Sequence, residues 1–214
     1  MERVDLLVKS GTVVRADGRF VADIAVKDGK IAGIIEEGLL PDAELAVDAE
    51  GKYVMAGVID PHIHMREPGI VEREDWITGT MAAAAGGVTT VLEHPVSIPP
   101  TNCAKAFLDK KVLADSKSLI DFGLYGGDGT TSIGNIAEQA AVGAVAFKTF
   151  IWDYPDRQDE FAGITCTDDD TLLDIFEEVA KTGLVQVLHA ESKSIVEHYT
   201  KKVIRSGRRA PTVH

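Results

Sequence analysis

Two histidines separated by one residue close a short apolar run. The run Val54–Ile59 leads through Asp60 and Pro61 to His62 and His64. Such a run closed by a turn signal predicts a buried strand, and side chains two residues apart on a strand point to the same side. Neutral imidazoles are common ligands of zinc and similar cations. The pair therefore indicates a metal site, although two histidines in a surface loop would give the same short pattern.

Two further residues that can bind a metal close later apolar runs. Lys148 stands in A-F-K-T-F, and His189 stands in V-L-H-A-E. Burying an ammonium without a partner is costly. Lys148 is therefore expected either to pair with an acid, for instance Glu93 or Glu191, or to be a neutral or chemically modified amine. A lysine carbamate, formed with carbon dioxide, is an anion whose two oxygens can bridge two metal ions.

The elements that must position these residues change character near residue 53. Residues 1–53 contain short β-rich runs separated by S-G, A-D-G and K-D-G-K, which predicts a small antiparallel β unit. From Val54 onward, apolar runs alternate with helical stretches, as in a parallel sheet that is either open or closed into a (β/α) barrel. The predicted strands are 54–60, 88–94, 119–125, 143–150 and 184–189. The predicted helices are 72–85, 102–115, 133–141, 168–181 and 192–206.

Active sites of parallel α/β folds lie at the carboxyl ends of the strands. At these ends the pattern places His62 and His64, then Glu93 and His94, then Lys148, and finally His189. The convergence of these residue types favours a metal site over an accidental grouping. The glycine-rich segment 126–134 lacks the spacing and the lysine of a phosphate loop, so it is expected to be a flexible turn.

The composition excludes several classes of partner. The chain has 214 residues, 45% of them hydrophobic, and a formal net charge of -12. This charge argues against nucleic acid or an anionic membrane surface as the main partner. Cys103 and Cys166 are too few for a disulfide framework and are expected to be free thiols. No secretion signal and no membrane span of about 18 apolar residues is recognisable, so we expect a cytoplasmic protein.

Four runs resemble the cyclic amidohydrolases, the group of allantoinases, hydantoinases, dihydropyrimidinases and dihydroorotases within the amidohydrolase superfamily. These runs are D-P-H-I-H-M-R-E-P-G, T-G-T-M-A-A-A-A-G-G-V-T-T-V, G-A-V-A-F-K and V-L-H-A-E. The resemblance implies hydrolysis of a ring C–N bond at a site with two divalent metal ions, usually Zn²⁺. By resemblance, His62 and His64 bind the more buried ion, Lys148 bridges both ions as N6-carboxylysine, and His189 binds the more exposed ion.

The resemblance also implies a fold and a division of the chain. Residues 54–214 are expected to form part of a (β/α)8 TIM-type barrel, about five of its eight units, in an α/β protein. Residues 1–53 are expected to form the N-terminal part of a small β-sandwich. The family's sixth-strand metal histidine and its catalytic aspartate would both fall beyond His214, so no catalytic residue is assigned within this chain. We therefore expect the N-terminal half of an enzyme that, at full length, forms a homo-oligomer, often a tetramer.

The residues around the metal site also bear on the substrate. Arg66 stands where dihydroorotases have an arginine that holds the substrate carboxylate, a task that suits its planar fork. An ion pair with Glu67 or Glu72 is the alternative for this arginine. The run H-P-V-S-I-P-P-T lacks the asparagine of dihydroorotases and is closer to allantoinases and hydantoinases. We therefore predict hydrolysis of an allantoin- or hydantoin-like ring, with a dihydroorotase or a non-catalytic scaffold relative as alternatives.

One further histidine stays open. His94 occupies a position where the family commonly has methionine. It is expected either to support the metal ligands from behind or to be a packed histidine of the core.

Overall fold

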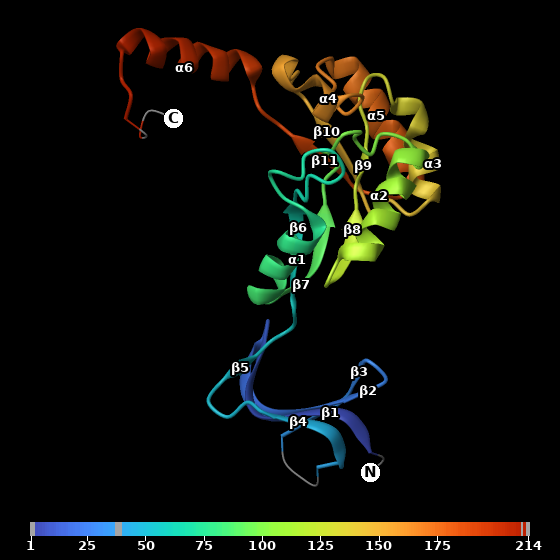
Figure 1. Cartoon of the computed structure of the whole chain (residues 1–214), viewed down its shortest axis with the longest axis vertical. Helices are drawn as coiled ribbons and strands as arrows, with labels where there is room; N and C mark the ends of the chain where they lie inside the picture. Colours follow the sequence, from blue (N-terminus) through green and yellow to red (C-terminus); the bar gives the residue numbers. More distant parts are fainter. Residues whose placement is uncertain (1–2, 37–39, 211, 213–214) are drawn as a thin grey trace. The chain divides into compact units, whose positions relative to one another are not determined.

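The computed structural model describes residues 3–36, 40–210 and 212, so His214 lies outside the described residues. Contacts between Cα atoms divide the chain into two compact units, residues 1–57 and 58–214. Figure 1 shows the order of the elements along the chain. Within the described ranges, no helix is long and apolar enough to cross a lipid bilayer.

The described part of the first unit is one mixed sheet. Its strands are β1 (Val4–Arg15), β2 (Gly18–Lys27), β3 (Lys30–Ile35), β4 (Ala43–Asp48) and β5 (Tyr53–Val54). The pairs β1–β2 and β2–β3 are antiparallel, whereas β4 and β5 both pair with β1 in parallel. The prediction of an antiparallel unit is therefore wrong for β4 and β5. After β3 the chain returns to pair with β1. Turn residues indicate where a strand ends, but not which distant strand the next one will pair with.

The S-G turn predicted within the first unit is a bulge instead. The register between β1 and β2 shifts between Val8 and Gly11, and Ser10 has a positive φ of 58°. A bulge inserts an extra residue without ending the strand. Two short predicted strands are therefore one continuous strand, β1.

The second unit is built on parallel strands, as the alternating pattern predicted. The strands are β6 (Val58–Ile63), β7 (Val88–Glu93), β8 (Asp121–Leu124), β9 (Gly126–Gly127), β10 (Phe147–Phe150) and β11 (Gln186–His189). The order is β6-β7-β8 in one sheet and β9-β10-β11 in the other, with every pairing parallel. Only Tyr125 separates β8 from β9, so these two segments act as one interrupted strand that joins the sheets. The five predicted strands of this unit are therefore confirmed.

Helices follow the strands in turn, close to the predicted ranges. They are α1 (Trp76–Ala85), α2 (Ala104–Lys117), α3 (Ile136–Ala141), α4 (Gln158–Phe161), α5 (Asp169–Thr182) and α6 (Lys193–Ser206), with short 3-10 turns η1 (Ile133–Asn135) and η2 (Pro155–Arg157). Asp75 caps α1 by accepting a hydrogen bond from the backbone N–H of Thr78 at 2.7 Å. Gly183 ends α5 in the left-handed conformation, with φ of 73°.

Two predicted segments differ most from the structure. The predicted first strand, 54–60, is shifted along the chain: Val54 belongs to β5, and β6 runs from Val58 to Ile63, past Asp60 and Pro61. β6 pairs only with β7 in the described residues, and an edge strand tolerates a proline because no partner needs its missing N–H. The segment 126–134 is not a flexible turn throughout, because Gly126 and Gly127 form β9 and are buried.

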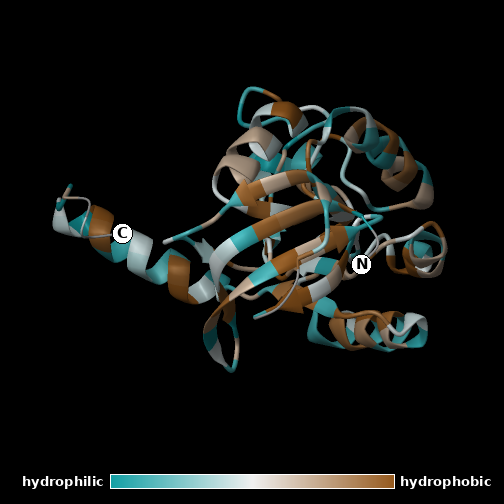
Figure 2. Cartoon of the chain, turned by 90° about the horizontal axis from the view of Figure 1, so that it is seen from below, coloured by the Kyte–Doolittle hydropathy of each residue, from teal (hydrophilic) through white to brown (hydrophobic). Residues whose placement is uncertain are grey.

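The main core of the second unit lies between the parallel strands and the helices. Its fully buried members include Trp76 of α1, Phe107 of α2, Phe147 of β10 and Ile175 of α5. α6 is different, since it has no buried residue and exposes several apolar side chains. Figure 2 shows hydrophobic and hydrophilic residues interleaved along this helix, next to the C-terminal end.

Candidate functional site

The His-x-His pair lies at the carboxyl end of β6. His62 is in the strand and His64 follows it, and their ring centroids are 5.7 Å apart with edge-to-face geometry. Burial, and next the charge of Arg66, lower the pKa of His64 to about 2. Burial and the charge of Lys148 also lower the pKa of His62. Both imidazoles are therefore neutral near pH 7, which is the form that binds a metal ion.

A third histidine packs against this pair. The ring of His94 stacks on His62 at 4.0 Å and on Tyr125 at 4.3 Å. Its Nε2 lies 3.3 Å from the carbonyl oxygen of Pro61, which also accepts a hydrogen bond from the Tyr125 hydroxyl at 3.1 Å. Burial lowers the pKa of His94 to about 3. His94 is thus a packed, neutral histidine that at the same time supports the ring of His62.

Two side-chain nitrogens of these histidines lack partners. Nδ1 of His64 and Nδ1 of His94 are both buried and accept or donate no hydrogen bond within the described residues. Buried polar atoms are normally satisfied, so an orphan imidazole nitrogen needs an explanation. A metal ion would explain the unpaired Nδ1 of His64, because an unprotonated imidazole nitrogen is a suitable metal ligand.

Glu93, one of the two acids expected to pair with Lys148, pairs with Lys110 instead. Lys110 Nζ lies 2.7 Å from Glu93 Oε1, and the two side chains are 1% and 0% exposed. The second carboxylate oxygen of Glu93 accepts the backbone N–H of Met65 at 2.7 Å. Because Met65 directly follows His64, this buried ion pair holds the end of the His-x-His segment. Sequence reasoning missed Lys110, since a single lysine in a helix ordinarily faces solvent.

Lys148 lies on β10 and is 1% exposed. Its ammonium makes no ion pair and no hydrogen bond in the described part of the chain, and its Nζ lies 5.3 Å from the centroid of the Phe150 ring. Burial lowers the pKa of Lys148. Glu191, the other expected acid partner, lies 3.4 Å from His189 Nε2 instead. The ion-paired alternative for Lys148 is therefore wrong, and a neutral or modified amine is the alternative that stays.

His189 lies at the carboxyl end of β11, directly opposite Phe150 of β10 in the parallel register. Its ring stacks on the Phe150 ring with a centroid distance of 5.3 Å. The charges of Lys148 and His189 both act on the pKa of His62, and Lys148 Nζ also lies 5.3 Å from the centroid of the Phe150 ring on which His189 stacks. The fold thus brings together residues from β6, β10 and β11.

The donor set is limited in number. Among the described residues, no group of three or more His, Cys, Asp or Glu side chains is arranged to hold a metal ion. The donors are two imidazoles from one strand, a third on β11, and the amine of Lys148, which becomes an oxygen donor only as a carbamate. This set fits zinc in kind, because zinc binds neutral imidazole and carboxylate-type oxygen.

Arg66 faces an acid that the sequence did not indicate. Its expected partners were Glu67 or Glu72, but its Nη1 lies 3.7 Å from Glu160 of α4. Glu67 pairs with Lys117. The alternative of an ion pair with Glu67 or Glu72 is therefore wrong, because the fold places Glu160 of α4 beside Arg66.

Three arginines converge on Glu160. Arg73 Nη1 lies 3.0 Å from Glu160 Oε2, and Arg157 Nε donates to Glu160 Oε1 at 3.0 Å. Burial and the charge of Arg157 lower the pKa of Arg66. Nη1 of Arg66 is buried and has no hydrogen-bond partner in the described residues. One carboxylate therefore faces three guanidinium groups, and Arg66 keeps free capacity to bind an anionic group near His64.

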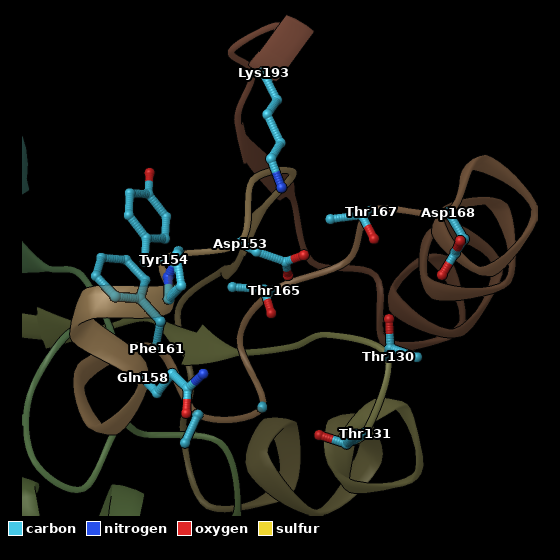
Figure 3. A pocket seen from close by; sticks show the side chains of 13 residues that line it. Thr130, Thr131, Asp153, Tyr154, Gln158, Phe161, Thr165, Thr167, Asp168 and Lys193 are labelled. Carbon is cyan, nitrogen blue, oxygen red and sulfur yellow. The ribbon is translucent and has the colours of Figure 1, made fainter. Parts of the chain in front are cut away.

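One pocket of the described structure lies away from the histidines. It measures about 640 Å³ and lies at the rim formed by the segments after β9 and β10 and the start of α5. Figure 3 shows threonine hydroxyls, Asp153 and Asp168 around it, with the side chain of Lys193 extending toward the loop that carries Asp153. None of His62, His64, Lys148 and His189 lines it. This pocket is therefore not the predicted metal site.

A model of the amidohydrolase family matches residues 53–212. This range contains every element from β5 through α6. It also contains all of the predicted site residues.

Curated relatives align over nearly all of the chain. An L-hydantoinase from Paenarthrobacter aurescens is 37% identical over 205 residues, which are 95% of this chain and 43% of the relative. An allantoinase from Bacillus velezensis is 40% identical over 205 residues, 95% of this chain and 44% of the relative. A dihydroorotase from Methanosarcina acetivorans is 33% identical over 191 residues, 89% of this chain and 39% of the relative. The chain thus spans less than half the length of each of these relatives.

Solved structures give the same result for the fold. The L-hydantoinase (dihydropyrimidinase) from Arthrobacter aurescens superposes with a TM-score of 0.88 at 35% sequence identity, over 98% of this chain and 46% of that one. A D-hydantoinase structure superposes with a TM-score of 0.79 at 32% identity, over 99% of this chain and 45% of that one.

Proposed function

Because the chain belongs to the amidohydrolase family, we propose that the protein hydrolyses a C–N bond of a cyclic amide of the allantoin or hydantoin kind. The observation that carries the proposal is the grouping of His62 and His189, near the carboxyl ends of β6 and β11, with Lys148 of β10, which has no acid paired to it in the described residues. The names of the similar proteins, L-hydantoinase and allantoinase, support the substrate class.

We propose that His62, His64 and His189, with Lys148 as N6-carboxylysine, hold two divalent metal ions. Zn²⁺ is the first candidate for both. Bound there, such ions would lower the pKa of water and polarise the amide carbonyl of the substrate. The lowered pKa values of His62 and His64 keep both imidazoles unprotonated and ready to bind. His94 and Tyr125 are buried, and their stacked rings support the ring of His62 from behind.

The environment of Lys148 favours carbamate formation. A neutral amine nitrogen attacks the carbon of carbon dioxide, the new N–C bond forms, and the amine proton passes to solvent. The product carries one negative charge where the ammonium carried one positive charge. Burial lowers the pKa of Lys148 and so increases the fraction of neutral amine at a given pH.

The remaining expectations on architecture are part of the same proposal. Residues 54–214 would form about five units of a (β/α)8 barrel, and residues 1–53 part of a β-sandwich. Val58 and Ile59 of the edge strand β6 are 48% and 60% exposed, which supports further packing on this side. The acid–base carboxylate would come from the part of the relatives that this chain does not match. The free thiols of Cys103 and Cys166 support a reducing compartment such as the cytoplasm.

Metal content and turnover test the proposal together. Protein prepared together with the part of the relatives that this chain does not match, from cells grown with zinc and bicarbonate, should contain about two divalent ions per chain. It should hydrolyse allantoin or hydantoin, and ¹³C-bicarbonate should label a carbamate carbon seen by NMR. Lys148→Arg should lose the label and the turnover, because a guanidinium stays charged and cannot take up carbon dioxide. Lys105→Arg, at an exposed position of α2, should keep both.

Two results would contradict the proposal. Equal turnover by wild type and Lys148→Arg would show that Lys148 is only structural. Absence of metal and of turnover in the wild type would support the non-catalytic scaffold relative instead.

One observation favours a second candidate, hydrolysis of dihydroorotate. Nη1 of Arg66 is buried and makes no hydrogen bond in the described residues, although it lies 3.7 Å from Glu160, so a substrate carboxylate could accept a hydrogen bond from it. The similar dihydroorotase supports the same idea. If it holds, Arg66→Lys should lower turnover of dihydroorotate at least tenfold and leave hydantoin turnover nearly unchanged. The tenfold loss corresponds to about 1.4 kcal/mol of binding energy to the substrate carboxylate. A wild type that ignores dihydroorotate would exclude this candidate.

A further inference from the structure

Asp128 is a buried carboxylate without a counter-charge. It follows β9 directly and is 0% exposed. The other buried acids of the described residues each face a lysine or arginine, as Glu67 faces Lys117, Glu93 faces Lys110 and Glu160 faces Arg157. Asp128 makes no ion pair there. Burying an unpaired charge is costly, so something must neutralise it.

The hydrogen bonds around Asp128 satisfy only one of its oxygens. Oδ1 accepts from the hydroxyl of Thr149 and from Nε2 of Gln186, the latter at 3.2 Å. Oδ2 is buried and has no partner, and so is Oε1 of Gln186. Two neighbouring groups therefore each present an oxygen that lacks a donor or a cation.

Turning the Gln186 amide around does not solve the problem. Its Nε2 donates to Thr149 Oγ1 at 2.8 Å, to Asp128 Oδ1 at 3.2 Å and to the carbonyl oxygen of Val187 at 3.3 Å. A flipped amide would turn Oε1 toward these three oxygens, where the Asp128 and Val187 oxygens offer no proton. The orientation with a free Oε1 is therefore the one that the surroundings require.

The cluster lies behind the strand that carries Lys148, on the other side of the sheet. Thr149 follows Lys148 on β10, and consecutive strand residues point to opposite faces. The backbone N–H of Asp128 donates to the carbonyl oxygen of Lys148 at 3.3 Å. Asp128, Thr149 and Gln186 thus connect β9, β10 and β11 at a place separate from the proposed zinc ligands.

We propose that Asp128 and Gln186, together with Thr149, bind a monovalent alkali cation, Na⁺ or K⁺. All donors in the cluster are hard oxygens, which suit such ions. One buried carboxylate neutralises one positive charge, whereas a divalent ion would leave a surplus charge in a buried place. The cation ties the ends of β9, β10 and β11 together and so fixes the strand on which Lys148 stands.

Thermal unfolding in different chloride salts tests the site. Tryptophan fluorescence, from the buried Trp76 and from Trp152 of the second unit, reports the transition. At equal ionic strength, NaCl or KCl should raise the melting temperature above that in choline chloride, whose cation is too large to enter. The rise should grow with the logarithm of the cation concentration and reach about 5–10 °C when the cation is at about 100 times its Kd.

Variants locate the effect. Asp128→Asn keeps the shape but removes the charge, so it should lose the salt response. Asp115→Asn, at an exposed position of α2, should keep the response. Gln186→Glu adds a second carboxylate and should shift the response toward Ca²⁺ or Mg²⁺, which gives a readout even if Asp128→Asn does not fold.

The proposal fails under two outcomes. Equal melting of the wild type in NaCl, KCl and choline chloride would show that Asp128 carries a proton instead of binding a cation. A sodium or potassium response that persists in Asp128→Asn, or that Gln186→Glu leaves unchanged, would place the binding elsewhere.

Discussion

Replacing Lys110 by methionine should be among the most destabilising single changes in the second unit. Methionine keeps most of the apolar stem but removes the ammonium that lies 2.7 Å from Glu93 Oε1. At an effective dielectric constant of about 20, the attraction lost at this distance is about 6 kcal/mol. Glu93 can escape part of this cost by taking up a proton. We therefore expect a loss of about 3–5 kcal/mol in the free energy of unfolding, as for other broken buried ion pairs.

The loss should depend on pH in a defined direction. Burial already raises the pKa of Glu93 above its ordinary value of 4.5, although Lys110 opposes the shift, and removal of Lys110 raises it further. A carboxyl whose pKa is raised on folding binds its proton more tightly in the folded state than in the unfolded state. This tighter proton binding stabilises the folded protein fully below pH 4.5, and the stabilisation is lost as the pH rises through the folded pKa. Lys110→Met should thus be least destabilised near pH 5, and the deficit should grow by at most about 1.4 kcal/mol per pH unit.

Urea unfolding between pH 5 and pH 8, followed by the fluorescence of Trp76 and Trp152, measures how this loss of stability depends on pH. Lys105→Met provides a matched control on the same helix, since Lys105 pairs with Asp109 at the surface, with side chains 83% and 63% exposed. This control should change stability by less than about 0.5 kcal/mol. The double variant Lys110→Met/Glu93→Gln should recover most of the loss, because the amide oxygen can still accept the N–H of Met65. A loss equal to that of the control, or one independent of pH, would refute the reasoning.

Two further changes test the connections of the second unit. Gly183→Ala should lower the free energy of unfolding in urea by about 1–2 kcal/mol, because φ is 73° at this helix end. Nothing lies within reach of an added Cβ, so the cost is one of backbone conformation. Gly183→Asn should cost less, and equal costs for the two variants would contradict this account. Gln139→Leu should cost about 1–3 kcal/mol, because the buried amide bonds both the N–H and the carbonyl oxygen of Gly127 at 3.1 Å. Gln158→Leu, at an exposed position, should be nearly neutral in the same assay, and an equal loss there would contradict the assignment.

Local spacing in the sequence was sufficient for the elements of the second unit. Alternating apolar runs and helical stretches predicted the parallel strands and the helices, because strand and helix periods are properties of neighbouring residues. The same spacing put His62 and His64 at the end of one strand, and Lys148 and His189 near the ends of two others. The expectation of a shared edge followed from the general rule for parallel α/β folds.

Only the tertiary structure decided which side chains meet. Glu93 and Lys110 form a buried pair that leaves Lys148 without an acid, and Glu160 reaches Arg73 across 87 positions of the chain. Likewise, β4 returns parallel to β1, which no turn pattern indicates. The physical reason is that the partner of a charge or of a strand edge depends on which distant segments the fold brings together. The strength of each pairing then depends on burial, which is a property of the whole unit and not of the local sequence.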